Sequence, residues 1–217
     1  MREVHETVIG KTQPFALQHL DKAHLGYDLT TDLALAAGSG PSLTASRAVI
    51  LPGDERWLPA NLGPKLRSYV QNGGRALSLG IDSLRRRATV TTTAQSSTAQ
   101  RPLGPFGADI FGARPGALVT NNRDFILVIK DGLGIFATTS GAFSHFPVFQ
   151  PFGDLAPPAG PIASAAGTSN QTPSIIGFPL GHGTVVEVGL PSFGMSLAGG
   201  NTDAQELVQR LWTVLSH

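Results

Sequence analysis

Acidic and hydroxyl side chains follow two apolar runs of the sequence, a position at which α/β proteins commonly place catalytic groups. Asp54 and Glu55 follow the first run, and Asp82 and Ser83 follow the second. In an open parallel sheet, ligands bind beyond the carboxyl ends of the strands. Two carboxylates at such an edge can do acid–base work or hold a divalent ion, and Asp82 or Ser83 can act as a nucleophile. These four residues are therefore our catalytic candidates.

The same residues also have a structural interpretation. Asp54 or Glu55 can cap the N-terminus of a following helix, and Asp82 or Ser83 can cap the segment that holds the arginines at 85–87. Capping acids are common at strand-to-helix turns, which favours this interpretation. Ser83 does not lie in the G-x-S-x-G sequence of a nucleophile elbow. The catalytic interpretation stays open beside it.

Other polar residues near the predicted strand ends and turns are candidates for ligand binding. They are Lys11, Thr12, Arg56, Trp57 and His182. The sequence contains no H-E-x-x-H zinc motif, no P-loop and no G-x-G-x-x-G dinucleotide fingerprint. We therefore predict no metal site and no cofactor.

Composition excludes several classes of protein. The 217 residues include no cysteine, and their formal net charge is +1. The missing cysteine excludes disulfide scaffolds, iron–sulfur clusters and thiolate nucleophiles. The balanced charge provides no field that would gather nucleic acid, and the longest apolar runs are far shorter than a membrane span. We expect a soluble domain without nucleic-acid partners, and the N-terminal residues show no hydrophobic core of a signal peptide.

Alternating strand-like and helical segments predict a parallel sheet in the first third of the chain. We expect strands at 4–9, 27–32, 47–53 and 75–80, with the strand at 47–53 in the centre of the sheet because its run is almost wholly apolar. The spacing of Leu62, Leu66, Tyr69 and Val70 predicts an amphipathic helix. A hairpin over 174–188 and a helix over 204–215 are expected at the C-terminal end.

The middle of the chain is rich in Thr, Ser, Gly and Pro and shows no helical period. We predict a β-rich insertion at about 88–180, with a hairpin whose strands at 125–130 and 134–138 are joined through Asp131-Gly132. If the protein binds a ligand, an apolar cleft is expected near this insertion. Its predicted lining is Phe143, Phe146, Phe149 and Phe152.

Several short segments resemble known families. The segments 69–75 and 80–83 resemble the class I glutamine amidotransferase-like fold, and 27–32, 51–57 and 181–189 are similar to the C-terminal domain of the N,N-dimethylformamidase large-subunit family. The resemblance implies a three-layer, flavodoxin-like α/β sandwich with a mostly parallel sheet, formed by 1–217 as a single domain with the β-rich insertion. It also implies a domain of a larger bacterial protein and favours an extracellular location.

The chain lacks the residues for both chemistries of these relatives. An active amidotransferase carries a cysteine where Asp82 stands, and the dimethylformamidase family holds iron through two tyrosines and a glutamate. Its D-E-Tyr-Trp motif reads Asp54-Glu55-Arg56-Trp57 here, and an arginine has no lone pair to give a metal. We therefore favour a non-catalytic domain that binds a small molecule or other domains of a parent protein. The alternatives are a hydrolase of amide or glycosidic bonds that uses the strand-end carboxylates, and a structural spacer domain.

Overall fold

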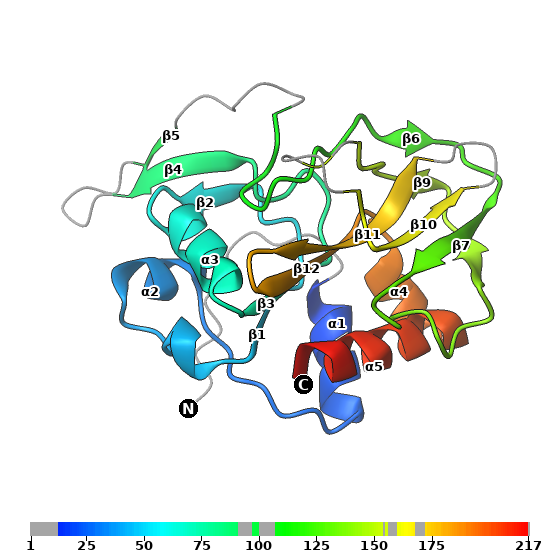
Figure 1. Cartoon of the computed structure of the whole chain (residues 1–217), viewed down its shortest axis with the longest axis horizontal. Helices are drawn as coiled ribbons and strands as arrows, with labels where there is room; N and C mark the ends of the chain where they lie inside the picture. The colour runs from blue at the N-terminus through cyan, green and yellow to red at the C-terminus, as the bar shows by residue number, and fades with distance from the viewer. Residues whose placement is uncertain are drawn as a thin grey trace.

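The computed structural model describes residues 13–90, 97–99, 107–153, 155, 160–167 and 172–216. Their helices and strands form a mixed α/β arrangement (Figure 1). The helices are α1 (Gln13–Lys22), α2 (Asp32–Ala37), the short 3-10 helix η1 (Leu43–Ala45), α3 (Leu62–Gln71), α4 (Phe193–Ala198) and α5 (Thr202–Ser216). The strands are β1 (Ala48–Leu51), β2 (Trp57–Pro59), β3 (Arg75–Ser78), β4 (Arg86–Val90), β5 (Ser97–Ala99), β6 (Val119–Thr120), β7 (Phe125–Asp131), β8 (Ala142–His145), β9 (Val148–Phe149), β10 (Ala163–Gly167), β11 (Pro173–Leu180) and β12 (Gly183–Val188).

A seven-stranded mixed sheet forms the centre of the described structure, with the order β1-β3-β12-β11-β10-β7-β8. The predicted α/β class is confirmed, but the expected mostly parallel sheet is wrong. Only the β1–β3 and β3–β12 pairs are parallel, and the pairs from β12 to β8 are antiparallel. The reason is local: tight turns such as that between β11 and β12 return the chain beside itself, which produces antiparallel pairs.

The first predicted buried strand does not lie in the centre of this sheet. β1 is the end strand of the sheet that the described residues form, and each of its residues is only partly buried. The apolar run at 47–53 therefore predicted a strand correctly, but the strand is less buried than we expected. The centre is formed by β11 and β12, whose residues are mostly buried.

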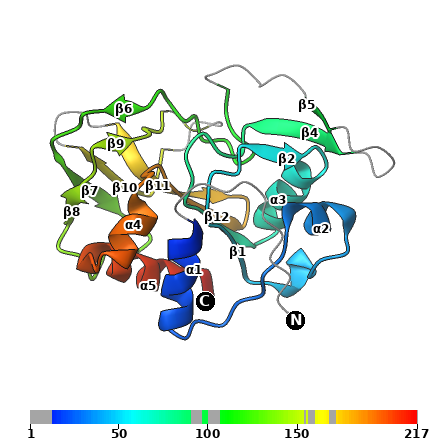
Figure 2. The same cartoon turned by 180° about the vertical axis from the view of Figure 1, so that it is seen from behind.

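Each face of the sheet covers its own apolar core. On one face, α1, α4 and α5 contribute buried residues such as Leu20, Phe193 and Leu211, and Figure 2 shows these helices on the same side of the molecule. On the other face, α3 contributes Leu66 and Val70, and they pack in one cluster with Phe111. Burial of these side chains is the main force that holds the layers together.

The helix-capping interpretation of the strand-end acids is wrong. The segment after Glu55 continues as the short strand β2, and α3 begins later with Asn61 as its N-cap residue. The arginines at 85–87 do not belong to a helix either, because β4 starts at Arg86. The acidic side chains are therefore available for other contacts.

Two other local predictions are also wrong. The segment 27–32 forms no strand, and Asp32 instead begins α2, which the Thr31 side chain caps by accepting a hydrogen bond from Ala34 N at 3.0 Å. The segment 134–138 turns instead of pairing with β7, since the Asp131 carboxylate accepts hydrogen bonds from Ile135 N and from the next amide. The described residues between 88 and 180 contain strands and turns but no helix.

The structure leaves one predicted strand untested and bears on the expectation about membrane spans. The predicted strand at 4–9 lies outside the described residues. Across the part of the chain that the structure describes, no helix has the length and apolar character needed to cross a membrane.

Candidate functional site

The four predicted catalytic residues lie in two turns that touch each other. These turns follow β1 and β3, whose parallel pairing brings their carboxyl ends to one edge of the sheet. Ile81 N donates a hydrogen bond of 2.8 Å to Asp54 Oδ1, and Leu84 N donates one of 2.9 Å to the Glu55 carbonyl oxygen. The site so formed, which we call the strand-end site, consists of Asp54, Glu55, Asp82 and Ser83.

Glycine at position 80 permits the contact between the two turns. A Cβ atom on Gly80 would lie 2.0 Å from the carbonyl oxygen of Gly53 and 2.5 Å from Ser83 Oγ. Such distances are far below van der Waals contact, so any larger residue would force the turns apart. The geometry of the strand-end site therefore depends on this one residue type.

Glu55 is the acid of the site that keeps its proton most readily. Burial raises the pKa of its carboxyl group to about 7, and the nearby negative charges of Asp32 and Asp54 contribute to the increase. A carboxyl group with such a pKa exists in both protonation states near neutral pH, which suits a general acid or base.

Asp82 has a different environment, in which cations balance its charge. Its Oδ1 lies 3.0 Å from Arg85 Nη1, and its Oδ2 lies 2.6 Å from Arg86 Nη1. Its backbone has a φ of 51°, a left-handed conformation that costs a non-glycine residue on the order of 1 kcal/mol. Gln150 supports this conformation, because its Oε1 accepts a hydrogen bond of 2.7 Å from Asp82 N.

Ser83 has no geometry that would make it a nucleophile. Its side chain is buried, and its hydroxyl donates a hydrogen bond of 3.2 Å to the carbonyl oxygen of Ile81. A serine nucleophile needs a base that accepts its proton, and here the proton goes to the backbone. Ser83 therefore stabilises the turn.

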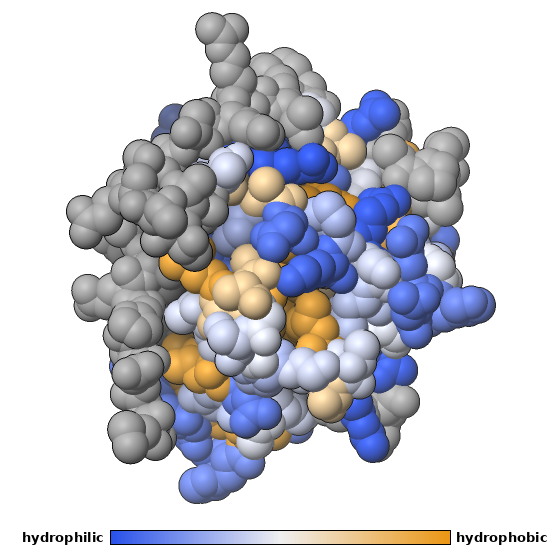
Figure 3. Space-filling view, turned by 90° about the vertical axis from the view of Figure 1, so that its left-hand side faces the viewer, coloured by the Kyte–Doolittle hydropathy of each residue, from blue (hydrophilic) through white to orange (hydrophobic). Residues whose placement is uncertain are grey.

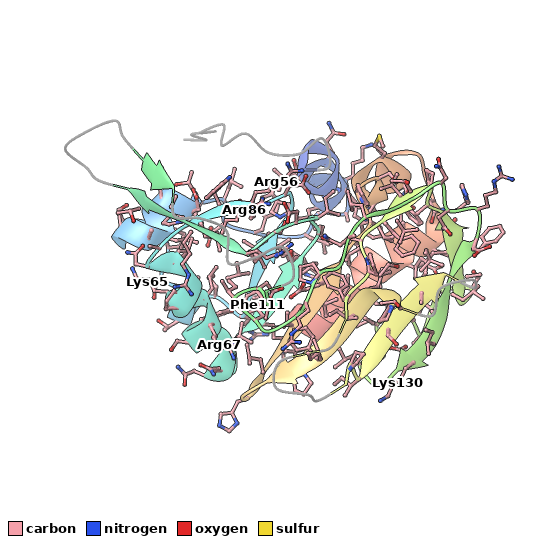
Figure 4. All side chains as sticks on the ribbon, turned by 90° about the horizontal axis from the view of Figure 1, so that it is seen from above. Arg56, Lys65, Arg67, Arg86, Phe111 and Lys130 are labelled. Atoms are coloured by element: carbon pink, nitrogen blue, oxygen red, sulfur yellow. The ribbon has the colours of Figure 1, made fainter. Side chains whose placement is uncertain are left out.

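Arg56 and Trp57 form the exposed rim of the strand-end site. The Arg56 side chain is 50% exposed and reaches Asp54 Oδ2 at 3.5 Å, and Trp57 is 41% exposed. The guanidinium of Arg86 stacks over the Trp57 ring, 5.7 Å from its centre. Arg56 and Arg86 lie close together in the view from above (Figure 4). The rim thus combines an aromatic surface with two cations.

The other predicted binding residues do not join this site. Lys11 and Thr12 lie outside the described residues. His182 is exposed in the β11–β12 turn, where its backbone N donates to the carbonyl oxygen of Gln71, at the opposite end of β3 from the strand-end site. Within the described ranges, no group of three or more His, Asp or Glu residues is placed to hold a metal ion.

The predicted aromatic cleft is a closed core. Phe143, Phe146, Phe149 and Phe152 are each at most 3% exposed and belong to the two apolar clusters of the protein. None of them is available to a ligand. These four side chains therefore form no apolar cleft in which a ligand could bind.

A hollow lies at the other end of the parallel strands. Its volume is about 1130 Å³, and it is bordered by Arg47, Lys65 and Arg75, with no acidic side chain among the described residues that line it. Lys65 Nζ already donates a hydrogen bond of 2.8 Å to the carbonyl oxygen of Ala36 at the end of α2. The side of the molecule that carries α2 and α3 presents mainly polar side chains with apolar patches between them (Figure 3).

A second pair of carboxyl groups was not found by sequence reasoning. Asp109 and Glu187 are both buried and hydrogen-bonded to each other through their side chains. Burial raises the pKa of Glu187 well above its ordinary value, and the charge of Asp109 raises it further. Burial also raises the pKa of Asp109, although three backbone amides that donate to its Oδ1 oppose this increase. Two carboxyl groups can form a hydrogen bond only if one of them carries a proton, and the directions of the pKa shifts favour Glu187 as the donor.

Comparisons with known proteins show similarity of fold only. The chain matches no family model and no curated protein sequence. Its structure resembles α-L-fucosidase isoenzyme 2 from Paenibacillus thiaminolyticus, with a TM-score of 0.58 at 14% identity over 100% of this chain and 31% of the fucosidase. It also resembles Gan42B, a GH42 β-galactosidase from G. stearothermophilus, with a TM-score of 0.52 at 15% identity over 96% of this chain and 27% of that enzyme. The chain thus spans less than a third of either glycosidase.

A third similar structure has nearly the size of this chain. It is the cytoplasmic protein STM3548 from Salmonella typhimurium, with a TM-score of 0.50 at 10% identity over 93% of this chain and 86% of that protein.

These comparisons correct the resemblance suggested by the sequence. The similar structures include glycosidases rather than glutamine amidotransferases or dimethylformamidases, and no family model supports the earlier assignment. The segments that carried the resemblance are short and belong to different elements, among them the end of α3, the start of α2 and the strand β12. Short segments of this kind occur in many unrelated α/β proteins, so they do not define a family.

The pKa of Glu55 predicts a specific effect of pH on stability. The folded-state pKa of about 7 exceeds the ordinary value of 4.5, so the contribution of Glu55 to stability is lost as pH rises from about 4.5 through 7. Glu55→Gln removes this loss. As pH rises from about 4.5 to above 7, the free energy of unfolding of the wild type should therefore fall by up to about 3 kcal/mol relative to that of the variant. Urea unfolding at a series of pH values measures this difference. Glu206→Gln on α5 is the control, and parallel pH profiles for Glu55→Gln and wild type would contradict the prediction.

The contact at Gly80 predicts a loss of stability on adding one methyl group. Gly80→Ala should lower the free energy of unfolding by about 2–4 kcal/mol, because the new Cβ overlaps the Gly53 carbonyl. Gly26→Ala is the matched control, since no atom lies within 4 Å of a Cβ at that position. Equal stabilities of the two variants would show that the turns do not touch as described.

Proposed function

We propose that this protein hydrolyses glycosidic bonds and that the strand-end site is its active site. The observation that carries the proposal is the pairing of unlike acids in two touching turns: Glu55, with a pKa of about 7, and Asp82, whose charge is balanced by two arginines. Glycosidases require this combination of a protonated carboxyl group and an ionised carboxylate. The fold similarity to a fucosidase and a β-galactosidase supports the proposal.

In the proposed reaction, Glu55 donates its proton to the glycosidic oxygen, and the bond between that oxygen and the anomeric carbon breaks. The leaving sugar or alcohol departs with the proton. Asp82 either attacks the anomeric carbon and forms an ester, which water then hydrolyses, or takes a proton from the water that attacks. The first course retains the anomeric configuration and the second inverts it. Asp54 helps to keep Glu55 protonated and holds the two turns together through Ile81.

The rim supplies a surface on which a sugar ring can rest. The C–H face of a pyranose is apolar and packs well on an exposed aromatic ring, and Trp57 offers such a ring. Arg56 and Arg86 stand beside it with hydrogen-bond donors for hydroxyl groups. We further propose that 1–217 form one domain in which the segment at about 88–180 is a β-rich insertion, because both cores pack on the same seven-stranded sheet.

A second candidate function is a non-catalytic domain of a larger protein that binds a ligand or other domains. One observation favours it: the carboxylates of Asp54 and Asp82 already form ion pairs with Arg56, Arg85 and Arg86. A substrate would have to displace part of this network.

A hydrolysis assay tests the proposal. We expect the wild type to release nitrophenol from at least one member of a panel of nitrophenyl glycosides. Asp82→Asn should then lower kcat by at least about 100-fold and Glu55→Gln by a similar factor, because each removes one half of the acid–base pair. Glu206→Gln on α5 serves as the control and should retain full activity.

The pH dependence and product stereochemistry complete the test. The wild-type rate should fall as pH rises through about 7, because Glu55 then loses the proton that it must donate. Proton NMR of the first product assigns Asp82 as nucleophile if the configuration is retained and as base if it is inverted. Absence of turnover across the panel, or turnover that survives both substitutions, would reject the active site and leave the non-catalytic function.

A further inference from the structure

A short loop at 109–113 connects the buried carboxyl pair to the strand-end site. The Asp109 carboxylate orders this loop, since its Oδ1 accepts hydrogen bonds of 2.8, 2.8 and 3.1 Å from the backbone amides of Phe111, Gly112 and Ala113. Asp109 N also donates to the Ala113 carbonyl oxygen at 2.8 Å. The loop is therefore a closed unit built around one carboxylate.

The same loop holds the turn that carries Asp82. Ile110 N donates a hydrogen bond of 3.1 Å to the carbonyl oxygen of Leu84, two residues after Asp82. Leu84 needs this support because its φ is 62°, a left-handed conformation that is unfavourable for leucine. From the outside, Arg67 Nη1 donates a hydrogen bond of 2.7 Å to the Ile110 carbonyl oxygen. Phe111, which is 1% exposed, lies beside Arg67 of α3 in the view of Figure 4.

Glu187 anchors this unit to the sheet. It lies on β12 opposite Ser78, the last residue of β3, and the strand-end turn begins directly after that residue. Its side chain is 4% exposed, and its Oε1 has no hydrogen-bond partner among the described residues. The link to Asp109 is therefore the polar contact that justifies burial of this carboxyl group.

The cations described near the pair have partners elsewhere. On the pair's own elements, Asp109 is the charge that acts on Glu187. Arg67 on α3 donates to the Ile110 carbonyl, and Arg85 and Arg86 after the strand-end turn pair with Asp82. The shared proton is thus what permits two carboxyl groups to remain together in this core.

We propose that Asp109 and Glu187 form a proton-held clamp that fixes the strand-end turn, so that loss of the shared proton releases the 109–113 loop and with it Asp82. Both are positioning residues, and their effect on catalysis rests on the proposed function. When the proton is lost, two negative charges face each other in an apolar core, and their repulsion is strong. The hydrogen bond from Ile110 N to the Leu84 carbonyl oxygen then opens, and the left-handed turn relaxes.

Hydrogen exchange measures the clamp without any substrate. Amide hydrogen exchange becomes faster with pH even in an unfolded peptide, because base catalyses it. After correction for this effect, we expect exchange at 82–87 and 109–113 in the wild type to accelerate about tenfold as pH rises from about 6 to about 9, because the clamp opens more often. In Glu187→Gln the amide still donates to Asp109 but cannot ionise. This extra acceleration should therefore vanish, while Glu206→Gln on α5 should behave like the wild type.

A second variant keeps the test decisive if Glu187→Gln fails to fold. Asp109→Asn keeps an oxygen that accepts the three backbone amides and replaces the facing charge by a neutral amide, so it should also abolish the alkaline acceleration. Acceleration in either folded variant equal to that of the wild type would overturn the clamp, and so would its absence in the wild type.

The clamp and the hydrolase can fail separately. Loss of the alkaline acceleration in the variants without glycoside turnover in any protein rejects the hydrolase and retains the clamp. Turnover that depends on Glu55 and Asp82 but is identical in wild type and Glu187→Gln up to about pH 9, together with unchanged exchange, rejects the clamp and retains the hydrolase.

Discussion

The close backbone approach between Gly53 and Gly80 is the constraint on which the site depends. The parallel pairing of β1 and β3 brings the turns that follow them to the same edge of the sheet. Because position 80 is a glycine without a side chain, the two turns can contact each other. The Asp54 carboxylate then accepts a hydrogen bond from Ile81 N, so the strand-end acids lie in neighbouring turns although they are far apart in the sequence. A side chain at this point would separate the turns, and the acids would become ordinary exposed residues.

The edge gathers more negative charge than an apolar environment tolerates, and the protein solves this in two ways. Asp82 is paired with Arg85 and Arg86, so its charge is compensated. Burial and a neighbouring acid instead raise the pKa of Glu55 and of Glu187, so that protonation removes part of the negative charge. The site therefore combines a carboxylate whose negative charge is stabilised by cations with a carboxyl group that binds a proton readily. Acid–base chemistry requires such a pair of unlike groups.

Sequence patterns predicted the elements with a strong period but not the contacts between them. The stripe from Leu62 to Val70 and the hairpin over 174–188 are found as α3 and as β11–β12. Local signals failed where tertiary contacts decide: the acids after β1 precede a strand rather than a helix, and β7 pairs with β8 instead of the segment after Asp131-Gly132. Asp109 and Glu187 were missed because each stands alone in its segment, and only folding brings them together.

The two carboxyl pairs of this protein cannot have the same role. Carboxyl groups that cleave a glycosidic bond stand at least about 5 Å apart with the sugar between them. Asp109 and Glu187 are in direct hydrogen-bond contact and buried, so no substrate fits between them. They can act only on what their loop touches, and that loop touches the carbonyl of Leu84 in the turn of Asp82. The partly exposed acids at the edge are therefore the candidates for chemistry, and the enclosed pair contacts the turn of Asp82 through its loop.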